Sequence, residues 1–70
     1  EVFEFIAKEG SRITEYPIKD LEFPEDAKIG GFIRGSKGFV AKGDTHIQAN
    51  DKVVVFALPS AIKKLDKYFK

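Results

Sequence analysis

The chain contains no cysteine, methionine or tryptophan, and it has only one histidine and three prolines. Without cysteine, it has no disulfide framework, no thiolate zinc site and no cysteine nucleophile. No apolar run approaches the roughly 18 residues of a membrane-spanning helix, and no signal-peptide pattern opens the sequence. Charge of one sign is also lacking, with 12 basic and 11 acidic residues. Because nucleic-acid binding depends on an excess of Lys and Arg, this balance argues against a general nucleic-acid binder.

The 70 residues are 43% hydrophobic, which is enough for one small core. A domain of this size buries only about 60% of the surface that its unfolded chain exposes, so a second copy or an attached domain is expected to stabilise it. The sequence begins at Glu1, without an initiating Met and directly in strand-like sequence. We therefore expect residues 1–70 to form a single domain that is a fragment of a longer protein.

Four segments have the composition of β-strands. Residues 2–8 alternate, with Phe3, Phe5 and Ala7 on one face, and predict a strand. Two β-prone runs, 29–34 and 37–42, flank the turn pair at positions 35 and 36 and predict a hairpin. Residues 53–58 are apolar without alternation, which predicts a central strand covered on both faces.

Two segments have helical features. Pro17 suits a first helical turn and Pro24 stops it, so a short helix is predicted between them. After Pro59, apolar residues recur at helical spacing up to Phe69, with Ser60 as the candidate N-cap. The predicted order is β-α-β-β-β-α, an α+β fold with one small, mostly antiparallel sheet.

The glycine-rich run of residues 30–38 has some features of a phosphate-binding loop. A P-loop requires Gly-x-x-x-x-Gly-Lys-Ser/Thr between a strand and a helix. Here Ser36 precedes Lys37, and strands are predicted on both sides. There is also no Gly-x-Gly-x-x-Gly fingerprint, so dinucleotide binding of the Rossmann type is not expected in this domain.

No group of residues has the pattern of a catalytic or metal site. His46 is the only histidine, and the nearby Asp44 and Asp51 fit turns better than a ligand cluster. No serine stands in a nucleophile-elbow context. We expect a binding or regulatory module with no catalytic residues and no metal ligands.

Three features fit binding. Arg34 lies at a predicted strand end, where a guanidinium reaches a phosphate or carboxylate, although a solvated turn arginine fits as well. The last helix carries Lys63, Lys64, Lys67 and Lys70, which form a solvated face or attract an acidic partner. An alternative from another class is a small RNA-binding domain using Phe39, whose surroundings match a few positions of the RNA-recognition signature.

Two longer stretches resemble a known family. Residues 21–35 (LEFPEDAKIGGFIRG) and 43–56 (GDTHIQANDKVVVF) are similar to segments of the TrkA-C (RCK-C) domain, the last domain of the peripheral subunit of Trk-type potassium uptake systems. Asn50 replaces the family's usual Gly before Asp51, and Lys42 stands where many relatives have Pro. Asn tolerates a positive φ better than most residues, so the fold accommodates the first change.

The resemblance implies a cytoplasmic regulatory domain, peripheral to the inner face of the cell membrane, that acts on a potassium transporter subunit. It also implies a homodimer and a small anionic effector such as cyclic di-AMP. Carried onto this sequence, the ligand-binding candidates are Ile29, Gly30, Arg34 and Lys42. No cofactor is implied here, because NAD(H) or ATP binds a preceding domain. A regulatory domain of another cation channel or antiporter fits too, and the residues do not separate a ligand sensor from a pure dimerisation module.

Overall fold

The computed structural model describes all 70 residues and has a four-stranded antiparallel sheet covered on one face only. The strands are β1 (Val2–Ile6), β2 (Ala27–Arg34), β3 (Lys37–Val40) and β4 (Lys52–Ala57). Their order in the sheet is β1-β4-β2-β3. Three 3₁₀ turns, η1 (Arg12–Thr14), η2 (Ile18–Asp20) and η3 (Pro59–Ala61), and the helix α1 (Ile62–Phe69) complete the chain. The predicted α+β architecture is confirmed.

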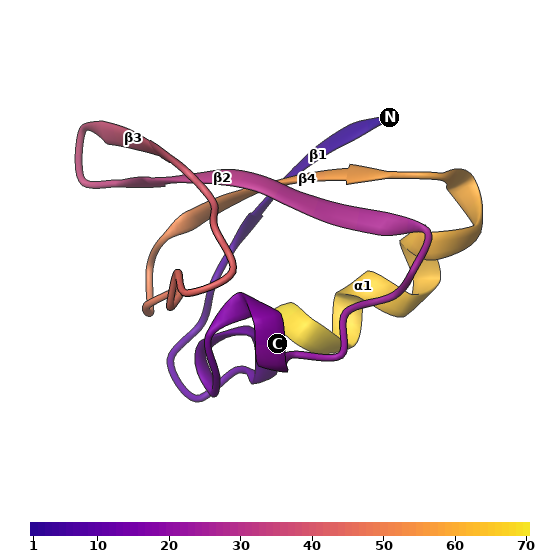
Figure 1. Cartoon of the computed structure of the whole chain (residues 1–70), viewed down its shortest axis with the longest axis horizontal. Coiled ribbons are helices and arrows are strands. Elements are labelled where there is room, and N and C mark those ends of the chain that lie inside the picture. The colour runs from indigo at the N-terminus through magenta and orange to yellow at the C-terminus, as the bar shows by residue number, and fades with distance from the viewer.

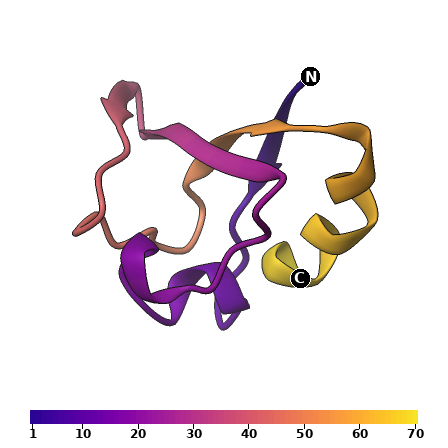
Figure 2. The same cartoon turned by 45° about the vertical axis from the view of Figure 1, so that its right-hand side comes forward.

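The helical segments lie on the same side of the sheet, as Figures 1 and 2 show from two directions. The core fills the space between these two layers. Phe5 of β1 stacks on Phe69 of α1 with ring centroids 4.4 Å apart, which joins the first and last elements. The buried apolar side chains are Ala7, Ile13, Leu21, Ile29, Phe32, Ile47, Val53, Val55, Ala57, Ala61, Leu65, Tyr68 and Phe69.

The predicted hairpin forms between β2 and β3, with Phe32 opposite Phe39 and Arg34 opposite Lys37. Gly35 has φ +64°, in the left-handed region that a tight turn uses and that glycine adopts without strain. Asn50 also has a positive φ, +75°, in the turn before β4. Asn50 therefore stands at a position with left-handed backbone, which Asn tolerates better than most residues.

Two local predictions are wrong. The segment that follows Pro17 forms only the 3₁₀ turn η2 rather than an α-helix, and a second 3₁₀ turn, η1, precedes it. Ser60 does not cap α1, because it lies inside η3 and donates its hydroxyl to Asp26 at 2.6 Å.

Strand β4 is central in the sheet, as predicted, but it is not covered on both faces. Val53 and Val55 are fully buried under the helical layer, whereas Phe56 is 51% exposed on the other face. The large apolar side chains on that open face are exposed in this chain, as at a candidate interaction surface. No helix in the structure is long and apolar enough to cross a membrane.

Candidate functional site on strand β2 and its hairpin

The four predicted ligand-binding residues do not form one site. Ile29 and Lys42 line the same hollow, of about 350 Å³, on the helical side of the sheet. Gly30 lies under the ring of Phe56 on the open face, and Arg34 is at the end of β2 against Asp51. The structure therefore brings Ile29 and Lys42 together and places Gly30 and Arg34 elsewhere.

The hollow has an apolar lining, with Lys42 as the basic side chain at its rim. Its lining contains no acidic residue, and Lys42 takes part in no ion pair. Lys28 also borders the hollow, but it pairs with Phe56, so its side chain lies on the open face of the sheet. An ammonium group next to an apolar surface suits an anion that carries an apolar or aromatic body. The lining residues are Ile18, Phe23, Ala27, Lys28, Ile29, Ala41, Lys42 and Gly43.

Backbone hydrogen bonds fix the wall of this hollow. The amide of Ile18 donates to the carbonyl of Thr45 at 2.9 Å, and that of Lys19 donates to Gly43 at 2.9 Å, which ties η2 to the loop after β3. Lys42 and Thr45 bond reciprocally, since the Lys42 amide donates to Thr45 Oγ1 at 2.9 Å and the Thr45 amide donates to the Lys42 carbonyl at 3.0 Å. These bonds hold the backbone of Lys42 at the rim.

Glycines distort β2 on the other side of this site. The pairing of β2 with β4 shifts by one residue between Ile29 and Gly31, so Gly30 is the extra residue of a β-bulge. A Cβ on Gly30 would collide with the Phe56 ring, and a Cβ on Gly31 would lie 2.5 Å from the carbonyl oxygen of Phe39. Gly31 is therefore required by the close approach of the Phe39 backbone, whereas Gly30 lies against the side-chain ring of Phe56.

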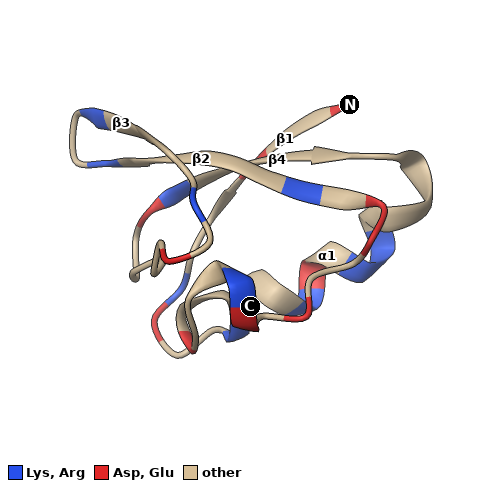
Figure 3. Cartoon of the chain, in the orientation of Figure 1, with Lys and Arg blue, Asp and Glu red and all other residues tan.

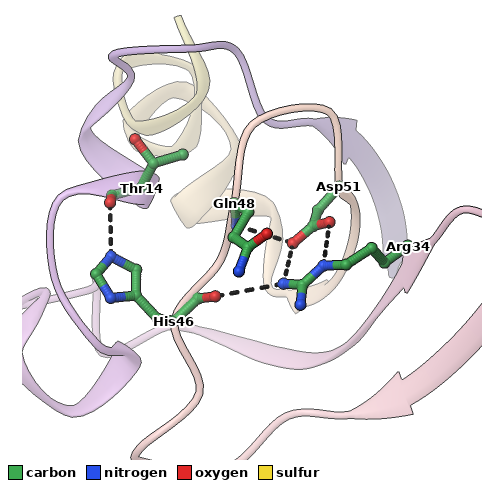
Figure 4. A network of polar contacts seen from close by, with 5 residues as sticks. All are labelled: Thr14, Arg34, His46, Gln48 and Asp51. Atoms are coloured by element: carbon green, nitrogen blue, oxygen red, sulfur yellow. Dashed lines mark hydrogen bonds and ion pairs between the residues drawn. The ribbon is translucent and has the colours of Figure 1, made fainter.

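Arg34 is the centre of a polar network that joins the hairpin to the loop before β4 (Figure 4). Its Nε and Nη2 donate to the two carboxylate oxygens of Asp51 at 2.9 and 2.7 Å, and Nη2 also reaches the His46 carbonyl at 3.4 Å. The Arg34 guanidinium lies 4.8 Å from the centroid of the Phe32 ring. Asp51 also accepts a 2.8 Å bond from the Gln48 amide.

The ion pair shifts the pKa values of both Arg34 and Asp51. The Arg34 hydrogen bond is the main reason that the pKa of Asp51 lies below its usual value, and burial of the carboxylate opposes that effect. The same bond raises the pKa of Arg34. The Asp51 side chain is only 2% exposed, but the Arg34 side chain is 39% exposed.

His46 is exposed, and its Nε2 lies 2.7 Å from the Thr14 carbonyl, so the ring links the loop to η1. No three His, Cys, Asp or Glu residues are placed to hold a metal ion. Phe39 stacks on Phe32 with centroids 4.9 Å apart, on the helical side of the sheet. This position removes Phe39 from the open face, where a stacked RNA base would otherwise lie.

Charge is distributed in small groups. Figure 3 shows acidic and basic positions mostly in the connections and helical segments, while much of the sheet carries neither. On α1, Lys64 pairs with Asp26 at 3.3 Å and Lys70 with Asp66 at 2.8 Å, which partly neutralises the predicted lysine face. The pKa of Asp26 is lowered mainly by the Ser60 hydroxyl.

Several site residues were not predicted. Lys28, Ile18 and Phe23 line the hollow with Ile29 and Lys42, and Asp51 is the ion-pair partner of Arg34. Ile18 and Phe23 lie in the segment that was predicted to form a short helix, and Asp51 was predicted to be a turn residue. Only the folded chain brings segments that are more than 10 residues apart into contact.

Comparisons with known proteins identify the family. Residues 2–70 match the TrkA-C domain family. Trk system potassium uptake protein TrkA homolog 1 from Methanosarcina mazei is 37% identical over all 70 residues, and the TrkA homolog from Archaeoglobus fulgidus is 37% identical over 60 residues, 86% of the chain. Trk system potassium uptake protein TrkA from Azorhizobium caulinodans is 33% identical over the whole chain. The chain spans 14 to 16% of the length of these relatives.

A solved structure shows the same fold. An RCK domain solved with "cda" superposes with a TM-score of 0.83 at 17% sequence identity, covering 99% of this chain and 97% of that one. This likeness supports the fold, and the sequence relatives support the family. Together with the sheet order and the glycine bulge, they explain the two sequence stretches that resembled the family. The chain belongs to the TrkA-C (RCK-C) domain family.

Proposed function

We propose that the chain is the regulatory domain of a Trk-type potassium uptake system, without catalytic activity of its own. The observation that carries this proposal is the match to the TrkA-C family over residues 2–70, together with relatives named Trk system potassium uptake proteins. The domain would act from the cytoplasm, peripheral to the membrane through the transporter subunit. A preceding domain of the full-length protein would bind NAD(H) or ATP.

The regulatory step follows from linkage. An effector shifts a transporter between two states only by the difference in its affinity for those states. The domain would pair as a homodimer, and a small anionic effector would favour one arrangement of the pair. The hollow at Ile29 and Lys42 supports the effector, since it joins an apolar lining to the unpaired cation of Lys42.

Replacing Lys42 with glutamine is expected to weaken effector binding at least tenfold, because it removes a charge at the rim while keeping most of the side chain's length. Isothermal titration calorimetry of the chain with cyclic di-AMP and common nucleotides measures this effect. Lys37→Gln is the matched control, because Lys37 is an exposed lysine on β3 outside the hollow.

The outcomes separate the two parts of the proposal. Saturable heat that Lys42→Gln reduces and Lys37→Gln does not supports an effector in the hollow. Equal loss in both variants, or an affinity that neither changes, contradicts this site. No heat with any of these ligands contradicts the nucleotide effector and leaves assembly as the role of the domain.

A further inference from the structure

Strand β1 is an edge strand of the sheet, and one side of its backbone has no partner strand. The Ala7 amide donates to the Asp51 carbonyl at 2.9 Å, so the odd-numbered residues of this segment bond to β4 and its continuation. In an antiparallel pair, the residues between the bonded ones point their N–H and C=O groups the other way. The backbone groups of Val2, Glu4 and Ile6 therefore point outward from the edge of the sheet.

This edge has few of the features that keep edge strands from pairing with other chains. Proteins usually protect an edge with prolines, bulges, several charges or a covering segment. Strand β1 contains no proline, pairs with β4 in one continuous register, and carries a single charged residue, Glu4. The hydrogen bonds of the turns and loops include none from the backbone of Val2, Glu4 or Ile6. The free backbone groups of β1 are therefore a template for a further strand.

We propose that β1 is a docking edge for an extended segment of another polypeptide, which extends the four-stranded sheet by one strand. Val2, Glu4 and Ile6 share the open face, and Val2 and Ile6 are 60% and 50% exposed. A strand laid alongside β1 places one residue opposite each of these three. The segment that fits is therefore apolar, basic and apolar at alternate positions. Because β1 contributes no residue to the hollow at Ile29 and Lys42, this interaction is separate from the proposed effector site.

The charge of Glu4 favours a basic segment over a second copy of this strand. Glu4 is exposed and makes no ion pair within the chain, so its carboxylate is available to a cation on the added strand. If two copies of β1 paired antiparallel with Val2 opposite Ile6, Glu4 would lie directly opposite its own copy, and like charges in that position are destabilising. The other edge strand, β3, is a poorer template because it has only four residues and includes Gly38.

Two synthetic peptides test this edge, Thr-Val-Thr-Lys-Thr-Val-Thr and the same sequence with Glu in place of Lys. NMR titration of the ¹⁵N-labelled 70-residue chain measures where each peptide binds and its dissociation constant. The lysine peptide is expected to shift the amide signals of Glu4 and Ile6, and to bind roughly threefold more tightly than the glutamate peptide because of the charge opposite Glu4. Glu4→Lys is expected to reverse this preference, which a change in folding alone would not do.

Glu4→Pro removes the outward N–H of Glu4 without removing a bond to β4, so it is expected to weaken the binding of both peptides at least fivefold. Val40→Pro is the matched control on the other edge strand. The Ala41 amide donates to the Gly30 carbonyl at 3.1 Å, so the N–H of Val40 also points outward, but from β3. Circular dichroism checks that both proline variants fold, and Glu4→Lys decides the test alone if Glu4→Pro does not.

The outcomes are distinct. Weaker binding to Glu4→Pro, a reversed preference in Glu4→Lys and unchanged binding to Val40→Pro support the docking edge. Shifts confined to β3, or a preference for the lysine peptide that Glu4→Lys leaves unchanged, overturn it. An unmodified chain that binds neither peptide at millimolar concentration also overturns it, and would mean that Glu4 keeps this edge free of other strands.

Discussion

Replacing Gly31 with alanine is expected to lower the free energy of unfolding by about 3 kcal/mol, the upper end of the usual cost of overpacking. A Cβ at this position lies 2.5 Å from the carbonyl oxygen of Phe39, which is backbone of the paired strand and has no rotamer to change. This collision is removed only if β2 and β3 move apart. Domains of this length typically have total stabilities of roughly 4 to 10 kcal/mol, so the loss is a large fraction.

The matched control is Gly38→Ala on the opposite strand of the same hairpin. A Cβ on Gly38 has no neighbour within 4 Å, and its backbone is not left-handed. Because glycine inside a strand costs roughly 0.5–1 kcal/mol relative to alanine, this variant is expected to match or slightly exceed the stability of the unmodified chain. Urea denaturation at a low micromolar protein concentration compares the free energies of unfolding of the two variants. Equal stabilities of Gly31→Ala and Gly38→Ala would mean that the hairpin backbone is looser than the structure shows.

The sequence was informative wherever a local pattern decides the structure. The alternation of residues 2–8, the Gly35 turn and the apolar run of residues 53–58 predicted all four strands, and the spacing of Ile62, Leu65 and Phe69 predicted α1. These patterns are short-range, since a turn or a strand face is specified by residues within a few positions of one another. The order β1-β4-β2-β3 depends on pairings between distant segments, which no local pattern specifies.

The apolar run of β4 was correctly predicted to be a central strand but wrongly predicted to be covered on both faces. Phe56 is apolar and 51% exposed in the isolated chain. A run without alternation predicts apolar residues on both faces of the strand, but it does not show that the rest of the chain covers both of them.

Arg34 was the hardest site residue to assign from the sequence. A guanidinium at a strand end fits a bound anion, a solvated turn or an internal carboxylate equally well until the fold is known. Asp51, 17 positions later, supplies that carboxylate, with both oxygens bonded to the guanidinium. Because Asp51 lies in a cluster of turn residues, the sequence alone did not indicate that it pairs with Arg34. The hollow at Ile29 and Lys42 was also difficult to predict, because Ile18 and Phe23 reach it from η2 and the segment that follows it.

Replacing Arg34 with methionine is expected to destabilise the chain by about 2 kcal/mol at neutral pH. Removing one partner of a fully buried ion pair costs roughly 3–5 kcal/mol. The expected loss is smaller because the Arg34 side chain is 39% exposed and water already screens part of the attraction. The Asp51 carboxylate, 2% exposed, then stays ionised with only the Gln48 amide as a close donor. Urea denaturation at pH 7 measures the difference.

The pH dependence distinguishes an ion pair from simple packing. In the unmodified chain, Arg34 holds the pKa of Asp51 below 3.8, so the stabilisation is fully present above this pH and is lost as pH falls through the lower folded-state value. In Arg34→Met, burial is no longer offset by the guanidinium and raises the pKa of Asp51 above 3.8. The folded variant then binds the proton more tightly than the unfolded one, so its stability rises as pH falls through that raised pKa.

The stability gap between Arg34→Met and the unmodified chain is therefore expected to narrow between pH 7 and pH 3. Lys70→Met is the charge-matched control, because Lys70 pairs with Asp66 on the exposed side of α1, where the two side chains are 71% and 64% exposed. The free energy of unfolding of Lys70→Met should change with pH as that of the unmodified chain does between pH 7 and pH 3, since solvent already screens this pair. An Arg34→Met gap that stays constant with pH would show that the methylenes of Arg34 over Phe32, and not its charge on Asp51, hold the hairpin to the loop before β4.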